Sequence, residues 1–435
     1  MHGRIFRRRP SRATALRRLI QVFYSATVTP MRPAHDERAL DVDLSTTRHA
    51  TCLKPAHGSQ AIVSGVCALV LLMIHTPVYA MLCGSSQPVP ETQKTINIRA
   101  VGDIVLGTNW PEPDKQIPPD VESRYFAGIG DLLSSGDVVF GNFEGTMTDA
   151  GASTKKTGKG TQFAFRMPPR FASILSDAGF NVLNIANNHT SDFGATGLED
   201  TVETIRSHGM FAVGLPNDIV YQEVKGVRIA WIGFSYLGIH NSIHDLGELE
   251  RLVHQARRYA KIVIVTFHGG AEGSDALRVV DGQEMYLGEK RGNPVRFART
   301  AVDAGADLVL GHGPHVLRGV ECYRNRLIVY SLGNFVGYQA FSTKRAAAIS
   351  MILDVTFDQD GQLRSVQFHP IRFTGENLPV IDPRRRALYL LNDLSQKPPL
   401  QNENTVLSGP LDGDRAYQAY QRWLRSEDLE SQLIP

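Results

Sequence analysis

Seven nearly continuous apolar runs of strand length, spread between Thr95 and Phe335, constrain the fold of this chain more than any other feature. They occupy residues 96–107, 137–145, 180–189, 227–235, 261–270, 307–315 and 326–335. Such runs are typical of strands that are buried on both faces. Helical patterns lie between them, at residues 168–179, 197–209 and 293–306, and each pattern stops at or next to a glycine. The alternation of strand and helix predicts an α/β fold with covering helices.

The pattern changes after about Thr343, where two long alternating segments are joined by Asp360 and Gly361. An Asp-Gly pair between two strands favours a hairpin, so we expect the sheet to gain antiparallel strands there. From Leu388 onward the tail is polar, and only residues 417–425 show a helical pattern. The regular pattern thus predicts a domain over residues 95–375, followed by a helical or irregular extension over residues 376–435.

The N-terminal region differs in charge from the rest of the chain. Residues 1–60 hold ten Arg and one Lys against four acids, a net charge of +7, whereas the whole chain carries +2. The remainder is therefore at −5, and nothing in it favours nucleic-acid binding. Residues 61–74 form an uncharged apolar stretch, and residues 78–80 supply small side chains for a signal peptidase. We therefore expect a basic, disordered leader over 1–60 and a signal peptide or membrane anchor over 61–80.

Either alternative exports the body of the protein, to the periplasm, to the exterior or to the outer side of the cytoplasmic membrane. Cleavage after Ala80 leaves two cysteines, Cys83 and Cys322. Export permits a disulfide between them, but two free thiols are an equal alternative at this stage. No CxxC spacing occurs, which excludes a zinc site built from cysteines.

Most of the apolar runs end in side chains that can bind a metal ion. Sites in open α/β sheets form beyond the carboxyl ends of the strands, so donors from different runs can meet there. The predicted metal ligands are Asp103, Glu144, Asn188, His268, His312 and His315. Carboxylate, amide and imidazole donors without thiolate suit one or two divalent ions, such as Mn²⁺, Fe²⁺, Zn²⁺ or Mg²⁺. Two ions would hold a phosphoryl group between them.

Single residues of this set also have structural explanations. Asp103 would fit an Asx-turn, and Asn188 or Asp192 would fit a helix N-cap. His268 would fit a buried, hydrogen-bonded imidazole. The pair in "GHGPH" is harder to explain structurally, because two histidines in a Gly/Pro turn have little use in a fold.

Other residues complete the predicted site. A histidine beside a metal centre can protonate a leaving group, and His189 has that place, with Asp192 as the second candidate catalytic residue. Arg291 lies shortly before the histidine turn and is a candidate for binding an anionic substrate. A solvated charged loop is an equal alternative for that arginine. Asn142 and Asn334 lie at strand ends and are further candidates for substrate binding.

Six motifs in this region resemble the CapA family of poly-γ-glutamate capsule biosynthesis proteins, in the order of that family. They are "VGDIVLG", "GNFEG", "NIANNHTSDFG", "FHGGAEG", "GADLVLGHGPHVLRGVE" and "YSLGNF". The family in turn looks like the calcineurin-type metallophosphoesterases, which implies a four-layer αββα sandwich. The resemblance covers residues 95–373 and assigns metal binding to the six residues above and proton donation to His189.

Three positions depart from the superfamily pattern. Val105 stands where a His ligand is expected, and Glu144 replaces a metal-bridging Asp. His312 and His315 are separated by two residues, where the superfamily has one. The departures leave one ion or a different reaction open, because one fold hosts many functions.

Two hypotheses follow. The first is an exported, metal-dependent hydrolase or transferase of the metallophosphoesterase type, which acts on a phosphate or γ-glutamyl linkage during surface-polymer synthesis. The second is a non-catalytic component of a membrane capsule synthesis or export complex that binds the polymer. In both cases the expected partner is an anionic polymer or a phosphate-containing substrate.

Overall fold

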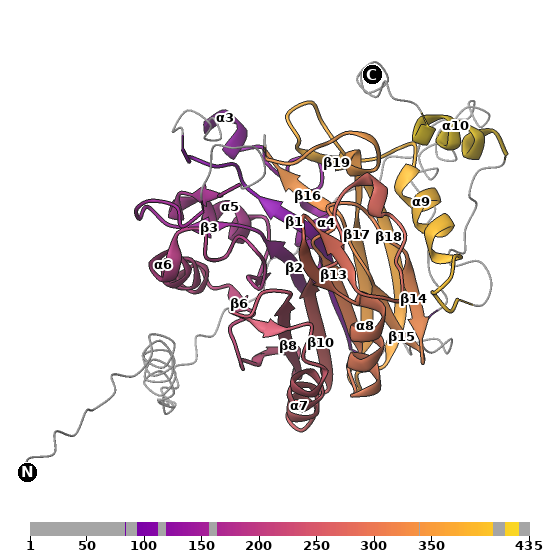
Figure 1. The fold of residues 1–435 in the computed structure, drawn as a ribbon, viewed down its shortest axis with the longest axis horizontal. Coiled ribbons are helices and arrows are strands. Elements are labelled where there is room, and N and C mark those ends of the chain that lie inside the picture. The colour runs from indigo at the N-terminus through magenta and orange to yellow at the C-terminus, as the bar shows by residue number, and fades with distance from the viewer. Residues whose placement is uncertain are drawn as a thin grey trace, which may run out of the picture. The chain divides into compact units, whose positions relative to one another are not determined.

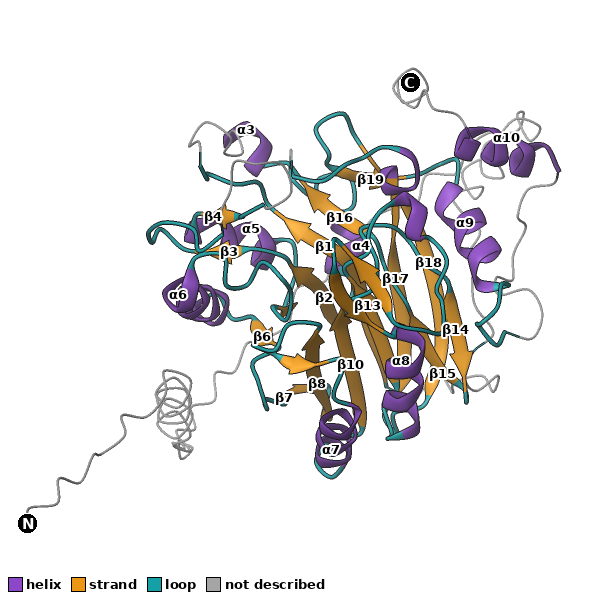
Figure 2. Cartoon of the chain, in the orientation of Figure 1, coloured by secondary structure: helices purple, strands orange, loops and turns teal. Residues whose placement is uncertain are grey.

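The computed structural model describes Cys83 and residues 94–111, 119–155, 163–338, 340–402 and 414–425. These residues fall within one compact unit. They form two large mixed sheets and a set of helices (Figures 1 and 2). The predicted leader and the predicted signal peptide or anchor lie outside the described residues. Among the helices that are described, none has the length and apolar character needed to span a membrane.

The first sheet has eight strands in the order β19-β18-β17-β1-β2-β5-β6, with β16 also paired to β1. The neighbours β16, β1, β2, β5 and β6 run parallel, whereas β17, β18 and β19 are antiparallel to their neighbours. The strands are β1 (Thr95–Val105), β2 (Val138–Phe143), β5 (Val182–Asn184), β6 (Phe211–Val213), β16 (Asn334–Gly337), β17 (Ile349–Asp358), β18 (Leu363–Phe373) and β19 (Pro379–Ile381). The predicted hairpin after Thr343 is thus confirmed, with Gly361 in the left-handed region at φ 79°.

The second sheet has seven strands in the order β14-β15-β13-β10-β8-β7, with β9 paired to β8. Its central strands β15, β13, β10 and β8 are parallel, and β14 and β7 close its two edges in antiparallel pairing. The strands are β7 (Val220–Val224), β8 (Val227–Ser235), β9 (Asn241–Ser242), β10 (Ile262–His268), β13 (Leu308–His312), β14 (Val320–Tyr323) and β15 (Arg326–Val329). Two further pairs stand apart: β3 (Thr146–Met147) with β4 (Arg166–Met167), and β11 (Glu284–Tyr286) with β12 (Glu289–Gly292).

The two sheets pack face to face, and helices cover their outer faces. Apolar side chains of both sheets share one core, in which Phe140 of β2 stacks on Trp231 of β8 with ring centroids 5.2 Å apart. A second core lies under α4 (Gly130–Ser134), α5 (Ala172–Asp177) and α6 (Gly194–Ser207). A third lies under α7 (Leu246–Arg257) and α8 (Pro294–Asp303). Central strands such as β2, β10 and β13 are therefore covered on both faces, which explains their continuous apolar runs, and the predicted four-layer αββα sandwich is confirmed.

Two expectations from the sequence need correction. The run 326–335 is not one strand but two, β15 in the second sheet and β16 in the first. The chain crosses between the sheets at Gly333, whose φ is 70°. A side chain at the facing Gly102 would meet the Gly333 carbonyl oxygen at 1.9 Å, so the crossing demands glycine.

The part of the tail between Leu388 and Ser395 is helical and not irregular. Helix α9 (Arg386–Ser395) packs against β14 of one sheet and β17 and β18 of the other. Its apolar residues are buried there, and α10 (Asp414–Arg425) packs on α9. The helix is short and begins within the arginine run 384–386, which hid its period in the sequence. The remaining short helix of the described residues is α3 (Pro119–Glu122).

Cys83 and Cys322 form a disulfide that links the segment before β1 to strand β14. Of the two alternatives left open by the sequence, the structure therefore has the bonded one.

Candidate metal centre

The candidate site lies where the carboxyl ends of strands from both sheets meet. In the first sheet, Asp103 of β1 is in register with Asn142 of β2 on one side and Asn334 of β16 on the other. In the second sheet, His268 of β10 is in register with His312 of β13. The pairing of β1 is irregular at Asp103, and such a bulge redirects the side chain. Asp103 is thus part of a strand, which excludes the Asx-turn alternative.

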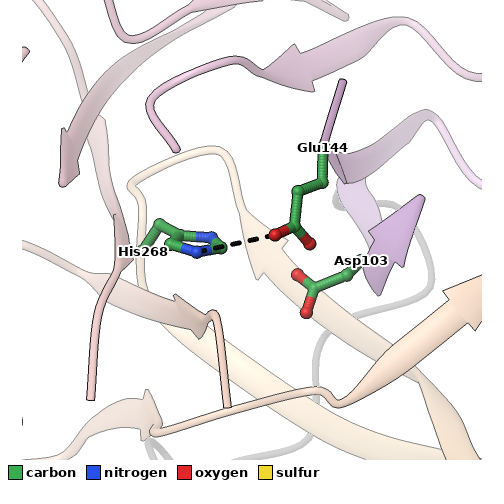
Figure 3. A group of neighbouring side chains, drawn as sticks. All are labelled: Asp103, Glu144 and His268. Carbon is green, nitrogen blue, oxygen red and sulfur yellow. Dashed lines mark ion pairs between the residues drawn. The ribbon is translucent and has the colours of Figure 1, made fainter. Parts of the chain in front are cut away.

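Asp103, Glu144 and His268 form the centre of the site (Figure 3). One ligand atom from each lies within 4.8 Å of the others, and all three residues are buried. The Nε2 atom of His268 is 3.8 Å from Oε1 of Glu144. Glu144 directly follows β2, and its backbone N–H donates to the carbonyl of Ile104. The geometry is that of a cavity large enough for an ion between three donors.

The histidine turn brings two further imidazoles to the same carboxylates. His312 Nδ1 lies 3.4 Å from Asp103 Oδ1, and His315 Nδ1 lies 3.1 Å from Asp103 Oδ2. The other ring nitrogen of His315 is 3.7 Å from Glu144 Oε1. The turn achieves this with Gly313 and His315 both at positive φ, 107° and 59°. A non-glycine residue in that region is uncommon and indicates a conformation held by its surroundings.

Several buried polar atoms of this cluster have no hydrogen-bond partner. They are Oδ2 of Asp103, both carboxylate oxygens of Glu144, Nε2 of His268, both ring nitrogens of His312, and Oδ1 of Asn188. Leaving such atoms unpaired costs free energy, so native structures supply partners from protein, water or ions. The unpaired set consists of oxygen and imidazole nitrogen donors, which suits a divalent cation. The residues therefore fit a metal ion, by their own chemistry.

The carboxylates and imidazoles perturb one another. Burial raises the pKa of Glu144 to about 8, and the neighbouring Asp103 and Glu272 act in the same direction. Burial also opposes the charge on Asp103, but the neighbouring imidazoles of His312 and His315 outweigh it and hold the pKa of Asp103 below its usual range. Burial disfavours the charge on His315, yet the two carboxylates raise its pKa to about 10. Opposed charges are thus packed around a common centre.

His189 stands beside the cluster. Its Nε2 is 3.8 Å from Glu144 Oε1, and its Nδ1 is 2.9 Å from Oδ2 of Asp192. Asp192 is buried and also binds the Lys155 ammonium at 2.6 Å. Burial lowers the pKa of His189, although Asp192 opposes that effect. Neither Asn188 nor Asp192 caps helix α6, whose N-cap is Phe193, so both polar side chains are free of that structural role.

Asn142 lies near the end of β2, as expected, and its side chain contacts two of the candidate ligands. Its side chain is fully buried, donates to Asp103 Oδ1 at 2.8 Å and contacts His268 Nδ1 at 3.3 Å. Its oxygen accepts from Asn184 at 2.8 Å and Asn187 at 3.4 Å. The amide therefore orients two candidate ligands from below, and this geometry fits a positioning role better than substrate contact.

A hollow of about 610 Å³ opens above the cluster. His189, Asn188 and His315 line it, as do the two other predicted substrate-binding residues, Arg291 and Asn334. Arg291 is buried and ion-paired to both Glu272 and Glu289, at 2.7 and 2.9 Å. The Arg291 guanidinium also lies 4.1 Å from the ring centroid of Tyr236. The solvated-loop alternative is therefore wrong, and binding of an anionic substrate by this arginine remains a prediction.

The structure thus brings together the residues predicted from the sequence, and metal binding by them remains a prediction. The sequence did not reveal Lys155, Glu272 or Phe341. Lys155 lies 3.2 Å from His189 Nδ1, and the Phe341 ring is 4.9 Å from that of His315. Glu272 follows His268 by four residues in "HGGAEG", and this spacing was the one available indication. Lys155 and Phe341 lie in loops without any pattern.

Residues 97–339 match the profile of the bacterial capsule synthesis protein PGA_cap family. The capsule biosynthesis protein CapA of Bacillus anthracis is 29% identical over 280 residues, which cover 60% of this chain and 64% of that protein. The PGA biosynthesis protein CapA of Bacillus subtilis is 31% identical over 266 residues, 57% of this chain and 65% of that protein. The chain therefore spans a little under two thirds of the length of these relatives.

Among solved structures, a calcineurin-like phosphoesterase from Bacillus subtilis aligns with 77% of this chain and 100% of its own, at 11% identity and a TM-score of 0.38. An NAD nucleotidase from Haemophilus influenzae aligns with 77% of this chain and 60% of its own, at 13% identity and a TM-score of 0.36. The sandwich architecture itself rests on the strand order and the layers described above.

Proposed function

This chain belongs to the bacterial capsule synthesis protein PGA_cap family, and from that premise we propose that it is a metal-dependent hydrolase or transferase. The proposed reaction is the transfer or hydrolysis of a phosphate or γ-glutamyl linkage during synthesis of a surface polymer. One observation carries the proposal: buried, unpaired oxygen and nitrogen donors surround a common centre beside His189. A site that only stabilised the fold would have no need of that extra imidazole.

The metal would be held by Asp103, Glu144, His268 and His312, with Asn188 and His315 as further ligands. One or two divalent ions of the Mn²⁺, Fe²⁺, Zn²⁺ or Mg²⁺ type suit this donor set. A bound ion supplies Lewis acidity, which stabilises negative charge on a phosphoryl or carbonyl oxygen. Asn142 fixes the ligands from beneath by its bonds to Asp103 and His268.

His189 is the proposed general acid. Asp192 accepts from Nδ1, which leaves Nε2 directed to the cluster, where a leaving group would need a proton. Lys155 holds the other oxygen of Asp192 and so prevents that carboxylate from rotating. The Phe165 ring, whose centroid is 4.4 Å from that of His189, limits water on the other side.

The decisive experiment combines metal analysis with an activity assay. The purified chain is expected to hold close to stoichiometric divalent metal and to hydrolyse generic phosphodiesters or γ-glutamyl peptides. His189→Ala should lower the rate by about 10²–10⁴, the usual contribution of a general acid, while metal content stays unchanged. His254→Ala, an exposed histidine on α7, is the matched control. An inert protein under every divalent ion tried would refute the enzyme proposal.

A second candidate function has one observation in its favour. Val105 occupies the position where the superfamily pattern has a histidine ligand, and its side chain lies fully in the core under helices α4 to α6. One ligand is therefore missing from the pattern. The alternative is a non-catalytic component of a membrane capsule synthesis or export complex. In that case His189→Ala would abolish polymer export without any measurable hydrolysis.

Export is part of the proposal. The Cys83–Cys322 disulfide supports it, because disulfides form and persist in oxidising compartments. An anionic polymer, or a phosphate-containing precursor of it, and the synthesis complex are the proposed partners outside the cytoplasmic membrane. Thiol labelling of the protein in intact cells tests this: Cys83 and Cys322 should be protected until a reductant is added. Labelling of either of these two residues without a reductant would contradict export.

A further inference from the structure

A second hollow, of about 630 Å³, lies at the opposite end of the seven-stranded sheet from the candidate metal centre. It is formed where β8, β10, β13 and β15 begin, and the β17–β18 turn of the other sheet closes it. In Figure 1 the helix α7 and the adjoining ends of β8 and β10 mark this end of the sandwich. Five basic residues line it: Arg228, Arg257, Arg258, Lys261 and Arg326.

The acids of the hollow neutralise only part of this charge. Buried Asp307 pairs with Arg257 at 2.7 Å and with Arg326 at 3.2 Å, and also accepts from the backbone of Val263. Each of these arginines uses only part of its guanidinium on Asp307. The third acid pair, Glu223 with Arg228 at 2.6 Å, is exposed. Paired in this way, the guanidiniums are held in fixed places and keep free N–H groups.

Two cations of the hollow are not neutralised. Within the part of the chain that the structure describes, neither Arg258 nor Lys261 has an ion-pair partner, and both are exposed. The one other acid of the hollow is Asp360, which also lies on the surface. The five cations therefore exceed the three acids Glu223, Asp307 and Asp360 by two charges.

The hollow continues into a neighbouring one of about 430 Å³, with which it shares Glu223, Arg228 and Tyr259. Tyr221 lines this extension, and its ring meets that of Tyr259 edge-on with centroids 6.3 Å apart. The Tyr221 hydroxyl is buried and has no hydrogen-bond partner. The two hollows form one groove, called the basic groove below, which is longer than a small ion requires.

We propose that the basic groove binds a linear polycarboxylate chain, at a site separate from the candidate metal centre. Guanidinium forks match the planar carboxylate group and can bind it with two hydrogen bonds. The embedded acids disfavour a polymer with a charge at every short step, such as a nucleic acid or polyphosphate. The groove would keep a polymer attached to the protein at a distance from the metal centre.

Binding of a fluorescently labelled poly-γ-glutamate oligomer to the full chain tests the proposal, measured by anisotropy at fixed salt. Arg258→Glu with Lys261→Glu should weaken binding by at least about tenfold, because two charge-assisted contacts are replaced by repulsion. Arg278→Glu with Arg296→Glu changes the net charge equally, on exposed residues outside both hollows, and should leave binding almost unchanged. The metal content of all variants should match the wild type, which separates this test from the proposed reaction.

Several results would overturn the proposal. One is that the wild type fails to bind the oligomer, and another is that both double variants lose affinity equally. Alternatively, polyphosphate or single-stranded DNA binds more tightly than the oligomer at the same salt and loses affinity in the groove variant. That last result would assign a different polyanion to the groove. Thermal melting of each variant verifies the fold, and all four substituted side chains are exposed.

Discussion

The two ends of the sandwich differ in how their charged groups are paired and exposed. At the carboxyl end, buried Glu144, His268 and His312 have polar atoms without partners. At the amino end, the buried acid Asp307 has two arginines and a backbone N–H as partners, and the unpaired cations there are exposed to water. The buried charged groups at the carboxyl end thus lack hydrogen-bond partners, whereas the buried acid at the amino end is paired and the unpaired cations there face solvent.

This difference shows what each end is built to bind. An enclosed set of unpaired donors costs stability until a small ion of high charge fills it. An open groove with fixed arginines loses little when empty, because water solvates its free N–H groups, and it can hold a long ligand by many weak contacts. The parallel strands explain the division: their carboxyl ends gather side chains into a hollow, whereas their amino ends follow turns on the surface.

The largest expected effect is on metal affinity at the carboxyl end. His268→Ala removes one of the three central donors, so the affinity for the metal should fall by at least about 100-fold. The loss of a residue that only hydrogen-bonds to a ligand already lowers metal affinity by about 10–100-fold. Metal analysis after dialysis against a weak chelator measures this. Arg258→Glu at the amino end is the control and should retain its metal. Equal retention by both variants would remove the distinction between the two ends.

The second prediction concerns acid. His240, which contacts Ser235 at the end of β8, is buried, and burial lowers its pKa to about 4. The unfolded chain binds a proton at this residue near pH 6.5, so stability from His240 is complete above that pH and declines as the pH falls to about 4. The expected loss is about 3 kcal/mol. Urea unfolding of wild type and His240→Asn between these pH values should show a smaller decline in the variant. Parallel curves would contradict the prediction.

The third prediction compares two buried acids, one from each end. Asp307→Asn should lower the free energy of unfolding by about 2 kcal/mol, because it leaves Arg257 and Arg326 without their shared carboxylate. Glu144→Gln in chelator-treated protein should instead raise stability at neutral pH. Burial lifts the pKa of Glu144 to about 8, so folding at neutral pH must protonate a carboxyl that is ionised in the unfolded chain, a cost that the amide does not carry. Urea unfolding of both variants measures these changes. Destabilisation by Glu144→Gln would mean that the Glu144 carboxyl already has stabilising partners in the cluster.

The sequence predicted the carboxyl end better than the amino end, for a physical reason. Asp103, Glu144, His268 and His312 follow or end apolar strands, and parallel strands bring such positions to one edge whatever their separation in sequence. Glu223, Arg257, Asp307 and Arg326 begin or flank the same strands, but charged residues at strand starts and helix ends are ordinary. Only the three-dimensional pairing shows that Asp307 joins two arginines.

The same limits apply within the candidate site. Asn334 was predicted at the end of a strand, but it begins β16, because the chain crosses between the sheets just before it. The direction of the Asn142 side chain depends on the bulge at Asp103, which no local pattern reports. The crossing at Gly333 was hidden because both strands around it are apolar. Arg291 was predicted to meet an anion, and the anions it meets are Glu272 and Glu289 of its own chain.

The smallest expected effect lies in the basic groove, at Tyr221. Tyr221→Phe removes one buried hydroxyl without a protein partner, which a ligand in the groove does not reach, so affinity for the poly-γ-glutamate oligomer should stay within about twofold of the wild type. Stability should stay the same or rise, because the variant no longer buries an unpaired polar group. Anisotropy and urea unfolding measure the two effects. A loss of affinity above about tenfold would mean that the ligand contacts the hydroxyl, and a loss of stability would assign the hydroxyl to the fold.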